Sequence, residues 1–353
     1  MSRQSSAAAA RPWPSRGEMS RSAFLRTLGT TALGAGVLLG AEACGSGGSG
    51  GGSSGKVYHG KQAAAHLQTI QTGAPFYIAE AKGYFEDERL DLKSVEAPGG
   101  TSAIRVLLGS THIGMTSTIG AITAYAKGVE DVRIIGGIFN MDATLFLAPA
   151  DSKISLDDLR GKKIGSSSPD SITTYFAHLL AREHGLTPGK DVKIVYAGGA
   201  PDAWAAAQHG VIDLAWSNPP FSTKLVEQDD ARVVIRNKTL KPKFADNVLV
   251  TSQSFIDDHA DVLERWLRAL GNAIRFMRSN TDEAAKIWAK GIHLDQSIAR
   301  KALDETLDGF SLALDHQGIE ANIDAAKQLG QLRSAPDLDT ILVDRFIPSK
   351  VTS

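Results

Sequence analysis

One stretch of this sequence constrains the fold more than any other, because it predicts a strand that enters a helix through a polar turn. The stretch covers residues 71–85. The preceding residues 64–70 are typical of a buried strand, and after Pro75 the apolar residues recur at helical spacing. Proline suits the first helical position because it lacks the N–H that would have no partner there. Thr72 and Gly73 are therefore expected beyond the strand end, the edge where open α/β sheets bind ligands.

The same strand, turn and helix pattern recurs in the first part of the chain. A strand predicted over residues 91–97 precedes a glycine-containing turn, and a short strand over 113–115 precedes a second polar turn. Hydroxyl side chains in such turns can cap the following helix, and glycine lets the backbone approach a bound group. The candidate residues of these two turns are Gly100, Thr101, Thr116 and Ser117.

Asp142 is the one acidic side chain in this set of turns. It follows a strand predicted over residues 131–139. One interpretation is that Asp142 caps its own turn, as Asp residues often do. The other is that its carboxylate pairs with an amine of a ligand.

The second part of the chain repeats the pattern with a serine-rich turn. Ser168 is predicted to cap a long helix that has Pro169 at its first position. Free N–H groups and the helix dipole favour an anion there, although plain capping would explain one such serine equally well. The candidate residues of this turn are Ser167, Ser168 and Ser171, and Asn218 opens a later helix.

The recurrence predicts an α/β chain with two lobes. Residues 57–148 plus 247–353 are expected to form lobe I and residues 149–246 lobe II, with a crossing at 149–151 and a returning strand at 247–251. Two crossings act as a hinge that lets the lobes close around a ligand. From Ser254 onward the apolar spacing predicts a helical C-terminal extension.

Composition excludes several classes of function. The net charge of −1 gives no basic excess for a nucleic-acid partner, and the single cysteine excludes an internal disulfide framework and a cysteine-rich metal site. No Ser/His/Asp set and no His/Glu spacing fit for a metal is recognised in the sequence. The sequence therefore predicts neither an enzyme nor a cofactor.

The N-terminal region resembles a bacterial lipoprotein signal. Residues 1–43 form a leader in which a basic segment precedes an apolar run, with Met19 as a candidate start. A twin-arginine-like motif has Ser22 at its second arginine position, so either export route stays open. Cys44 is the predicted lipidation site, although Ala41 replaces the usual leucine, and an ordinary cleaved signal is the alternative. Residues 44–56 would form a Gly/Ser tether with a reach of ~18 Å.

Three segments carry a resemblance to a known family. They are residues 75–85, 157–165 and 210–213. With the signal and the two lobes, the chain resembles solute-binding proteins of ABC importers, in the group for aliphatic sulfonates, nitrate, taurine and thiamine-precursor pyrimidines. The resemblance implies a two-lobe periplasmic-binding-protein (type 2) fold. It also implies an extracytoplasmic monomer, lipid-anchored or periplasmic, that binds its ligand between the lobes and docks on a permease with its ATPase.

Carried over to this sequence, the resemblance implies that the polar turns contact the ligand. No arginine or lysine occurs among these turns, so amides and hydroxyls would hold an anion. Neighbouring aromatic residues either form walls for an organic group or pack in the core. The residues implied are Thr72, Gly73, Gly100, Thr101, Thr116, Ser117, Ser167, Ser168, Ser171 and Asn218, with the aromatic candidates Phe76, Phe139, Tyr175 and Trp216.

Three functions remain to be compared. The first is capture of a small organic anion such as a sulfonate, and the second is capture of an aromatic heterocycle such as a pyrimidine, which Asp142 would favour. The third is an enzyme, because the family includes fungal pyrimidine synthases that use a lysine-bound pyridoxal phosphate and a histidine. The matching positions here are Thr116 and Gly120, which can neither form an imine nor supply an imidazole.

Overall fold

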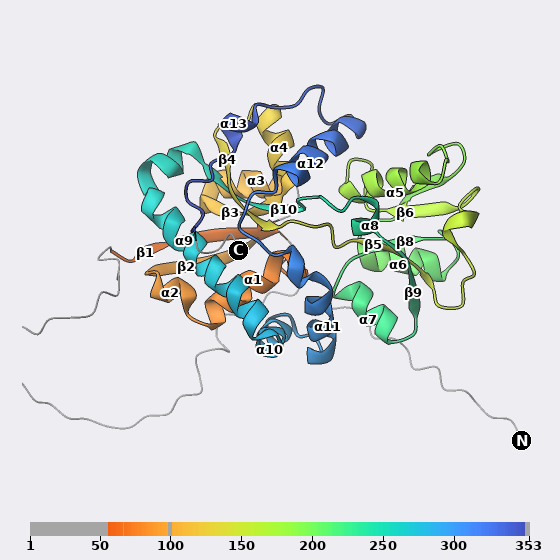
Figure 1. Ribbon diagram of the computed structural model, residues 1–353, viewed down its shortest axis with the longest axis horizontal. Helices are drawn as coiled ribbons and strands as arrows, with labels where there is room; N and C mark the ends of the chain where they lie inside the picture. The colour runs from red at the N-terminus through yellow and green to blue at the C-terminus, as the bar shows by residue number, and fades with distance from the viewer. Residues whose placement is uncertain (1–55, 66, 98–100, 350–353) are drawn as a thin grey trace, which may run out of the picture. The chain divides into compact units, whose positions relative to one another are not determined.

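The computed structural model describes residues 56–65, 67–97 and 101–349. The predicted leader, Cys44, most of the Gly/Ser tether and Gly100 lie outside the described residues. Over the described part, strands and helices are interspersed up to β10, and the remainder is mostly helical, as predicted (Figure 1).

A five-stranded mixed sheet forms the first layer. Its strand order is β2-β1-β3-β10-β4, with β1 parallel to β2 and β3, and β10 antiparallel to β3 and β4. Residue 247 begins β10, so the segment predicted to return to the first lobe does pair with its strands. The strands are β1 (Tyr58–Ala65), β2 (Leu90–Ala97), β3 (Ile113–Ser117), β4 (Val132–Phe139) and β10 (Asn247–Ser252).

The first predicted junction is displaced along the chain. The strand ends at Ala65, and α1 (Ile70–Ala81) begins after Thr69, which has the extended conformation of an N-cap. Pro75 therefore lies inside the helix and not at its first position. The prediction was wrong because most of the first helical turns are buried, and tertiary packing of that surface outweighs the backbone hydrogen bond that a proline removes.

A three-stranded and a two-stranded sheet follow. The strand order of the first is β8-β5-β9, and β6 pairs in parallel with β7. Their strands are β5 (Leu145–Pro149), β6 (Lys163–Ser166), β7 (Lys193–Tyr196), β8 (Ala215–Ser217) and β9 (Ala231–Arg236).

Strand β5 shows that the first crossing comes earlier than predicted. Residues 143–148 were expected to precede the crossing, yet β5 pairs with β8 and β9 in the second sheet. The chain therefore changes sheets between Phe139 and Leu145. Proline and aspartate at 149–151 lie at the end of β5. Such turn residues end strands in general, so they did not indicate the end of a lobe.

Helices cover these sheets and form the C-terminal third (Figure 1). The helices before β10 are α2 (Tyr84–Asp87), α3 (Thr101–Val106), α4 (Thr118–Ala126), α5 (Ile172–Glu183), α6 (Ala200–Gln208), α7 (Phe221–Glu227) and α8 (Asn237–Leu240). Those after β10 are α9 (Gln253–Ser279), α10 (Thr281–Ile292), α11 (Gln296–Thr306), α12 (His316–Gln328) and α13 (Leu338–Ile341). No helix of the described residues is both long enough and apolar enough to cross a bilayer.

Two large hydrophobic clusters hold the layers together. The first surrounds Trp266 and Trp288, and it joins α1 to α9, α10 and α11. The second includes Phe176 of α5, Phe244 and Ile122 of α4, so it joins helices on both sides of the crossings. Helix α12 adds further buried residues to this second cluster and so extends the packing across the crossings.

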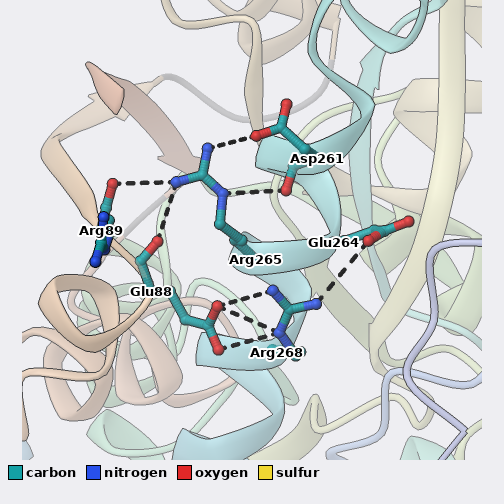
Figure 2. A network of polar contacts seen from close by, with 6 residues as sticks. All are labelled: Glu88, Arg89, Asp261, Glu264, Arg265 and Arg268. Carbon is teal, nitrogen blue, oxygen red and sulfur yellow. Dashed lines mark hydrogen bonds and ion pairs between the residues drawn. The ribbon is translucent and has the colours of Figure 1, made fainter. Parts of the chain in front are cut away.

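A polar network ties the long helix α9 to the end of α2 (Figure 2). Arg265, whose side chain is 5% exposed, donates to the backbone carbonyl of Glu88 at 3.1 Å and to Asp261 at 2.7 Å. Arg268 donates three hydrogen bonds to the carboxylate of Glu88, from Nη2 at 2.9 Å and from Nε at 3.1 and 3.2 Å. Glu88 thus contacts both arginines, which fixes the register between α2 and α9.

Candidate ligand-binding cleft

A cavity of about 480 Å³ lies between elements of the first sheet and elements of the second and third. It is lined from one side by α1, α4 and the start of β10, and from the other by the loop before α5 and by β8. We refer to this cavity as the cleft. Its lining residues are Thr69, Gln71, Thr72, Ser117, Ile119, Gly120, Thr123, Thr144, Ser167, Ser168, Asp170, Ser171, Ile172, Thr173, Trp216, Asn218, Asp246, Asn247 and Gln331.

The first turn of α1 contributes hydroxyl and amide groups. The hydroxyls of Thr69 and Thr72 lie 2.7 Å apart, which holds Thr72 in place at the helix start. Gln71 lines the cleft with 6% of its surface exposed, and its Oε1 has no hydrogen-bond partner among the described residues. An unpaired buried amide of this kind is costly, so it favours a ligand or water that completes its bonding.

The start of α4 lies against the second crossing. Ser117 is the N-cap and accepts a hydrogen bond from the backbone N–H of Gly120 at 3.3 Å. The N–H of Thr118 donates to the carbonyl of Asp246 at 2.9 Å, and the N–H of Asp246 donates to the carbonyl of Phe139 at 3.0 Å. These bonds place the side chains of Asp246 and Asn247 at the cleft beside the first turn of α4.

The serine-rich turn also reaches the cleft, but its capping differs from the prediction. Ser171, and not Ser168, is the N-cap of α5, and it accepts from the N–H of Thr174 at 3.3 Å. Pro169 lies in the loop before the helix. Ser168 still contributes, because its carbonyl accepts from Ser171 Oγ at 2.9 Å and its side chain lines the cleft. The helix therefore starts later than predicted. Several neighbouring hydroxyl residues could serve as its cap, and the sequence alone does not show which of them does.

Of the four aromatic candidates, only Trp216 lines the cleft. Its Nε1–H donates to the carbonyl of Gly198 at 3.0 Å, which fixes the indole. Phe76 packs against Trp266 in the core, Phe139 packs edge-on against Phe310, and Tyr175 packs against Phe176. For these three residues the core-packing alternative therefore holds. The sequence left the choice open because a strand or helix end has both a buried and an open side, and spacing alone does not distinguish them.

Two further candidates are not brought to the cleft. Thr116 is fully buried within β3, and a Cβ at Gly73 would lie 1.8 Å from the carbonyl oxygen of Leu67, so this glycine permits close packing of α1 on the preceding turn. Thr101 begins α3, and its side chain lies outside the described part of the chain, so its predicted role stays a prediction. The remaining candidates do line the cleft: Thr72, Ser117, Ser167, Ser168, Ser171 and Asn218.

Asp142 lies behind the cleft and not at its surface. It is 1% exposed and accepts hydrogen bonds from the N–H of Thr144 at 2.8 Å and from Nδ2 of Asn237 at 3.2 Å. The turn-capping interpretation is therefore the one that the structure supports. Burial raises the pKa of Asp142 from 3.8 to about 6, although the bonds from Thr144 and Asn237 act in the opposite direction.

A second carboxyl, which the sequence reasoning missed, does reach the cleft. Asp246 is partly exposed there, yet the protein around it raises its pKa well above 3.8 by desolvation, and the nearby Asp142 raises it further. One signal could have identified it: Asp246–Asn247 is a polar pair at the start of the predicted returning strand, as Thr116–Ser117 is at the end of another.

The far end of the chain completes the cleft. Gln331, just after α12, donates from Nε2 to the backbone carbonyl of Asp170 in the loop before α5. This contact joins the C-terminal part to the serine-rich turn, and no local pattern in the sequence predicted it. In the described ranges, no group of three His, Cys, Asp or Glu side chains is arranged to hold a metal ion.

Comparison with known proteins places the chain in a family. Residues 71–284 match the family described as NMT1/THI5 like. A Bacillus subtilis (strain 168) protein named for aliphatic sulfonate binding is 25% identical over 247 residues, which cover 67% of this chain and 72% of that protein. A Candida albicans (strain WO-1) 4-amino-5-hydroxymethyl-2-methylpyrimidine phosphate synthase is 24% identical over 231 residues, covering 61% of this chain and 66% of the synthase.

Solved structures share the fold. The periplasmic aliphatic sulphonate binding protein SsuA from Escherichia coli superposes with a TM-score of 0.70 at 18% identity, covering 81% of this chain and 92% of that one. The matched stretches span 37% to 72% of the curated relatives. The predicted α/β periplasmic-binding-protein fold is thereby confirmed, and this chain belongs to the NMT1/THI5-like family.

Proposed function

We propose that this protein is the extracytoplasmic solute-binding component of an ABC importer and that it captures a small organic molecule in the cleft. The observation that carries the proposal is the cleft itself: about 480 Å³, lined from both sides by the starts of α1, α4 and α5. Such a volume suits a small ligand, and closure of two sides around it would present a distinct form to a permease.

The first ligand class we propose is an organic acid of the sulfonate type. Ser171 caps α5 and Ser117 caps α4, so two helix N-termini carry hydroxyls into one cavity. Hydroxyls and amides at helix starts can hold an oxyanion without a fixed cation. The relatives named for sulfonate binding support the same class.

A binding role accounts for the lining better than catalysis does. Thr116, the position that matches the lysine of the pyrimidine synthases, is buried in β3, and Gly120 at the cleft has no side chain to donate. The described lining residues include no lysine, histidine or cysteine. A pyrimidine ligand remains the second candidate, because Trp216 offers a ring face and Asp246 offers an acceptor for an amine.

Lipid anchoring and the partners complete the proposal. Cys44 would carry the lipid, residues 45–56 would hold the folded part away from the membrane, and the closed form would dock as a monomer on a permease and its ATPase. Alternating runs of glycine and serine are flexible enough for such a tether.

A thermal-shift screen tests the binding function. We expect an alkanesulfonate or an aminopyrimidine to raise the melting temperature, since a ligand at a hundred times its dissociation constant adds about 2.7 kcal/mol of stability. Ser168→Trp should abolish the shift by filling the cleft, whereas Ser279→Trp, on the exposed end of α9, should preserve it. No shift with either class of compound would contradict the proposal.

A further inference from the structure

The charged groups of the cleft are of one sign. Asp246 and Asp170 are its charged lining residues, and among the described residues that line it there is no lysine or arginine. Asp142 lies behind the same wall, since its hydrogen-bond partner Thr144 lines the cleft. A ligand that carried only negative charge would therefore enter against a repulsive field.

The two lining carboxyls differ in what they bond. Asp170 accepts a hydrogen bond from Ser168 Oγ at 3.1 Å and is exposed. The carboxyl of Asp246 makes no hydrogen bond or ion pair with the other described residues, although its backbone is held at both its N–H and its carbonyl. Asp246 is thus a fixed, unpaired acceptor in a partly enclosed cavity.

Neighbouring groups strengthen this assignment. Asn247 and Gln71 line the cleft on the same side as Asp246, each is 6% exposed, and each has an amide oxygen with no partner among the described residues. Three polar side chains with unfilled bonding capacity therefore line the cleft from the side of α1 and β10, while the hydroxyls of the α5 turn line it from the other side. Buried polar groups in folded proteins are normally paired, so this arrangement suits a ligand that donates hydrogen bonds.

We propose that Asp246 is the specificity-determining residue of the cleft and that it selects ligands that carry an amino or ammonium group. The inference rests on the proposed binding function and refines its ligand class. The amine would donate to the carboxylate of Asp246, and any acidic or ring portion would lie toward Ser171 and Trp216. A charge-assisted hydrogen bond of this kind changes affinity by about tenfold or more.

Titration calorimetry with two matched pairs of compounds tests the inference. The pairs are 2-aminoethanesulfonate with ethanesulfonate, and 4-aminopyrimidine with pyrimidine, which differ mainly by the amine. For whichever pair binds, we expect the amine-bearing compound to bind at least about tenfold more tightly to the unmodified protein. Asp246→Asn should remove that preference, and Asp170→Asn should retain it.

Each other outcome contradicts a specific part of the proposal. Equal binding of the two members of a pair, or a preference that survives Asp246→Asn, overturns the role of Asp246 and leaves the binding function intact. Loss of the preference in Asp170→Asn alone would show that Asp170, and not Asp246, selects the amine, and would overturn the inference. Failure of all four compounds to bind overturns the proposed ligand classes together with the inference. Melting temperatures of both variants verify that they fold.

Discussion

The indole N–H of Trp266 on α9 donates to Oε1 of Gln62 on β1 at 2.7 Å, in the interior of the larger hydrophobic cluster. This bond joins the long C-terminal helix to the central part of the first sheet. The amide of Gln62 also donates from Nε2 to Ser94 on β2 at 3.1 Å, so one side chain links α9 with two neighbouring strands.

Replacing this indole should cost more than replacing an equally buried one. Trp266→Phe leaves Oε1 of Gln62 buried without its donor, which costs about 1–3 kcal/mol beyond the change in packing. Trp288 is also fully buried, but its N–H has no partner among the described residues, so Trp288→Phe is the matched control. Chemical denaturation measures both. Equal losses of stability would contradict the importance of the bond.

Stability should depend on pH through Asp142. Its pKa is raised from 3.8 to about 6, so the folded protein holds the proton more tightly than the unfolded chain does. The resulting stabilisation is complete below pH 3.8 and is lost as the pH rises through about 6. Asp142→Asn keeps an acceptor for Thr144 and should be more stable than the unmodified protein at pH 8, by up to about 3 kcal/mol.

The pH profile provides the check on that prediction. The difference between Asp142→Asn and the unmodified protein should shrink as the pH falls from 8 toward 4. Removing the charge of Asp142 should also lower the pKa of Asp246, because the two carboxyls repel each other. A constant difference over this range, measured by urea unfolding, would be inconsistent with a raised pKa.

The two arginines of Figure 2 should differ in their effect on stability. Arg265→Met removes a buried side chain that donates to the carbonyl of Glu88 and is expected to cost about 2–4 kcal/mol. Arg268→Met breaks an ion pair of an arginine that is 40% exposed, and such pairs contribute about 1 kcal/mol or less. Thermal unfolding of both variants measures the difference. A larger loss of stability in Arg268→Met than in Arg265→Met would contradict the prediction.

Capping and ligand binding can be separated with two serines. Ser171→Ala and Ser252→Ala each remove the N-cap of a helix, α5 and α9, and should each cost about 1 kcal/mol of stability. Only Ser171 lines the cleft, so only its replacement should weaken binding of a responsive compound by severalfold. Calorimetry that finds the same affinity in all three proteins would place the ligand away from the start of α5.

The predicted anchor is testable in cells. If Cys44 carries a lipid, the full chain should incorporate labelled palmitate and sediment with membranes, because each buried CH₂ contributes about 0.8 kcal/mol to membrane binding. Cys44→Ala removes the only thiol of the chain and should give no label. An unlabelled wild-type protein would eliminate the anchor and leave the cleft unaffected.

The sequence alone determined those features that depend on neighbours along the chain. Serines at helix starts, glycines at helix ends, strand spacing and the segment at residues 75–85 led to the fold and to seven cleft residues, because capping and periodicity act over a few residues. For Asp142 the sequence left two interpretations open, and its hydrogen bond with Thr144 supports the one in which it caps its turn.

Only the tertiary structure decided which side of each element faces the cleft. Phe76 and Thr116 have the same local setting as lining residues but point into the core, and the tight contact of Gly73 with Leu67 depends on how α1 packs. Asp246 and Gln331 reach the cleft from segments far along the chain. Contacts of this kind depend on how whole layers pack. Because that packing is stabilised by the total apolar area buried, no local pattern in the sequence shows which distant residues will meet.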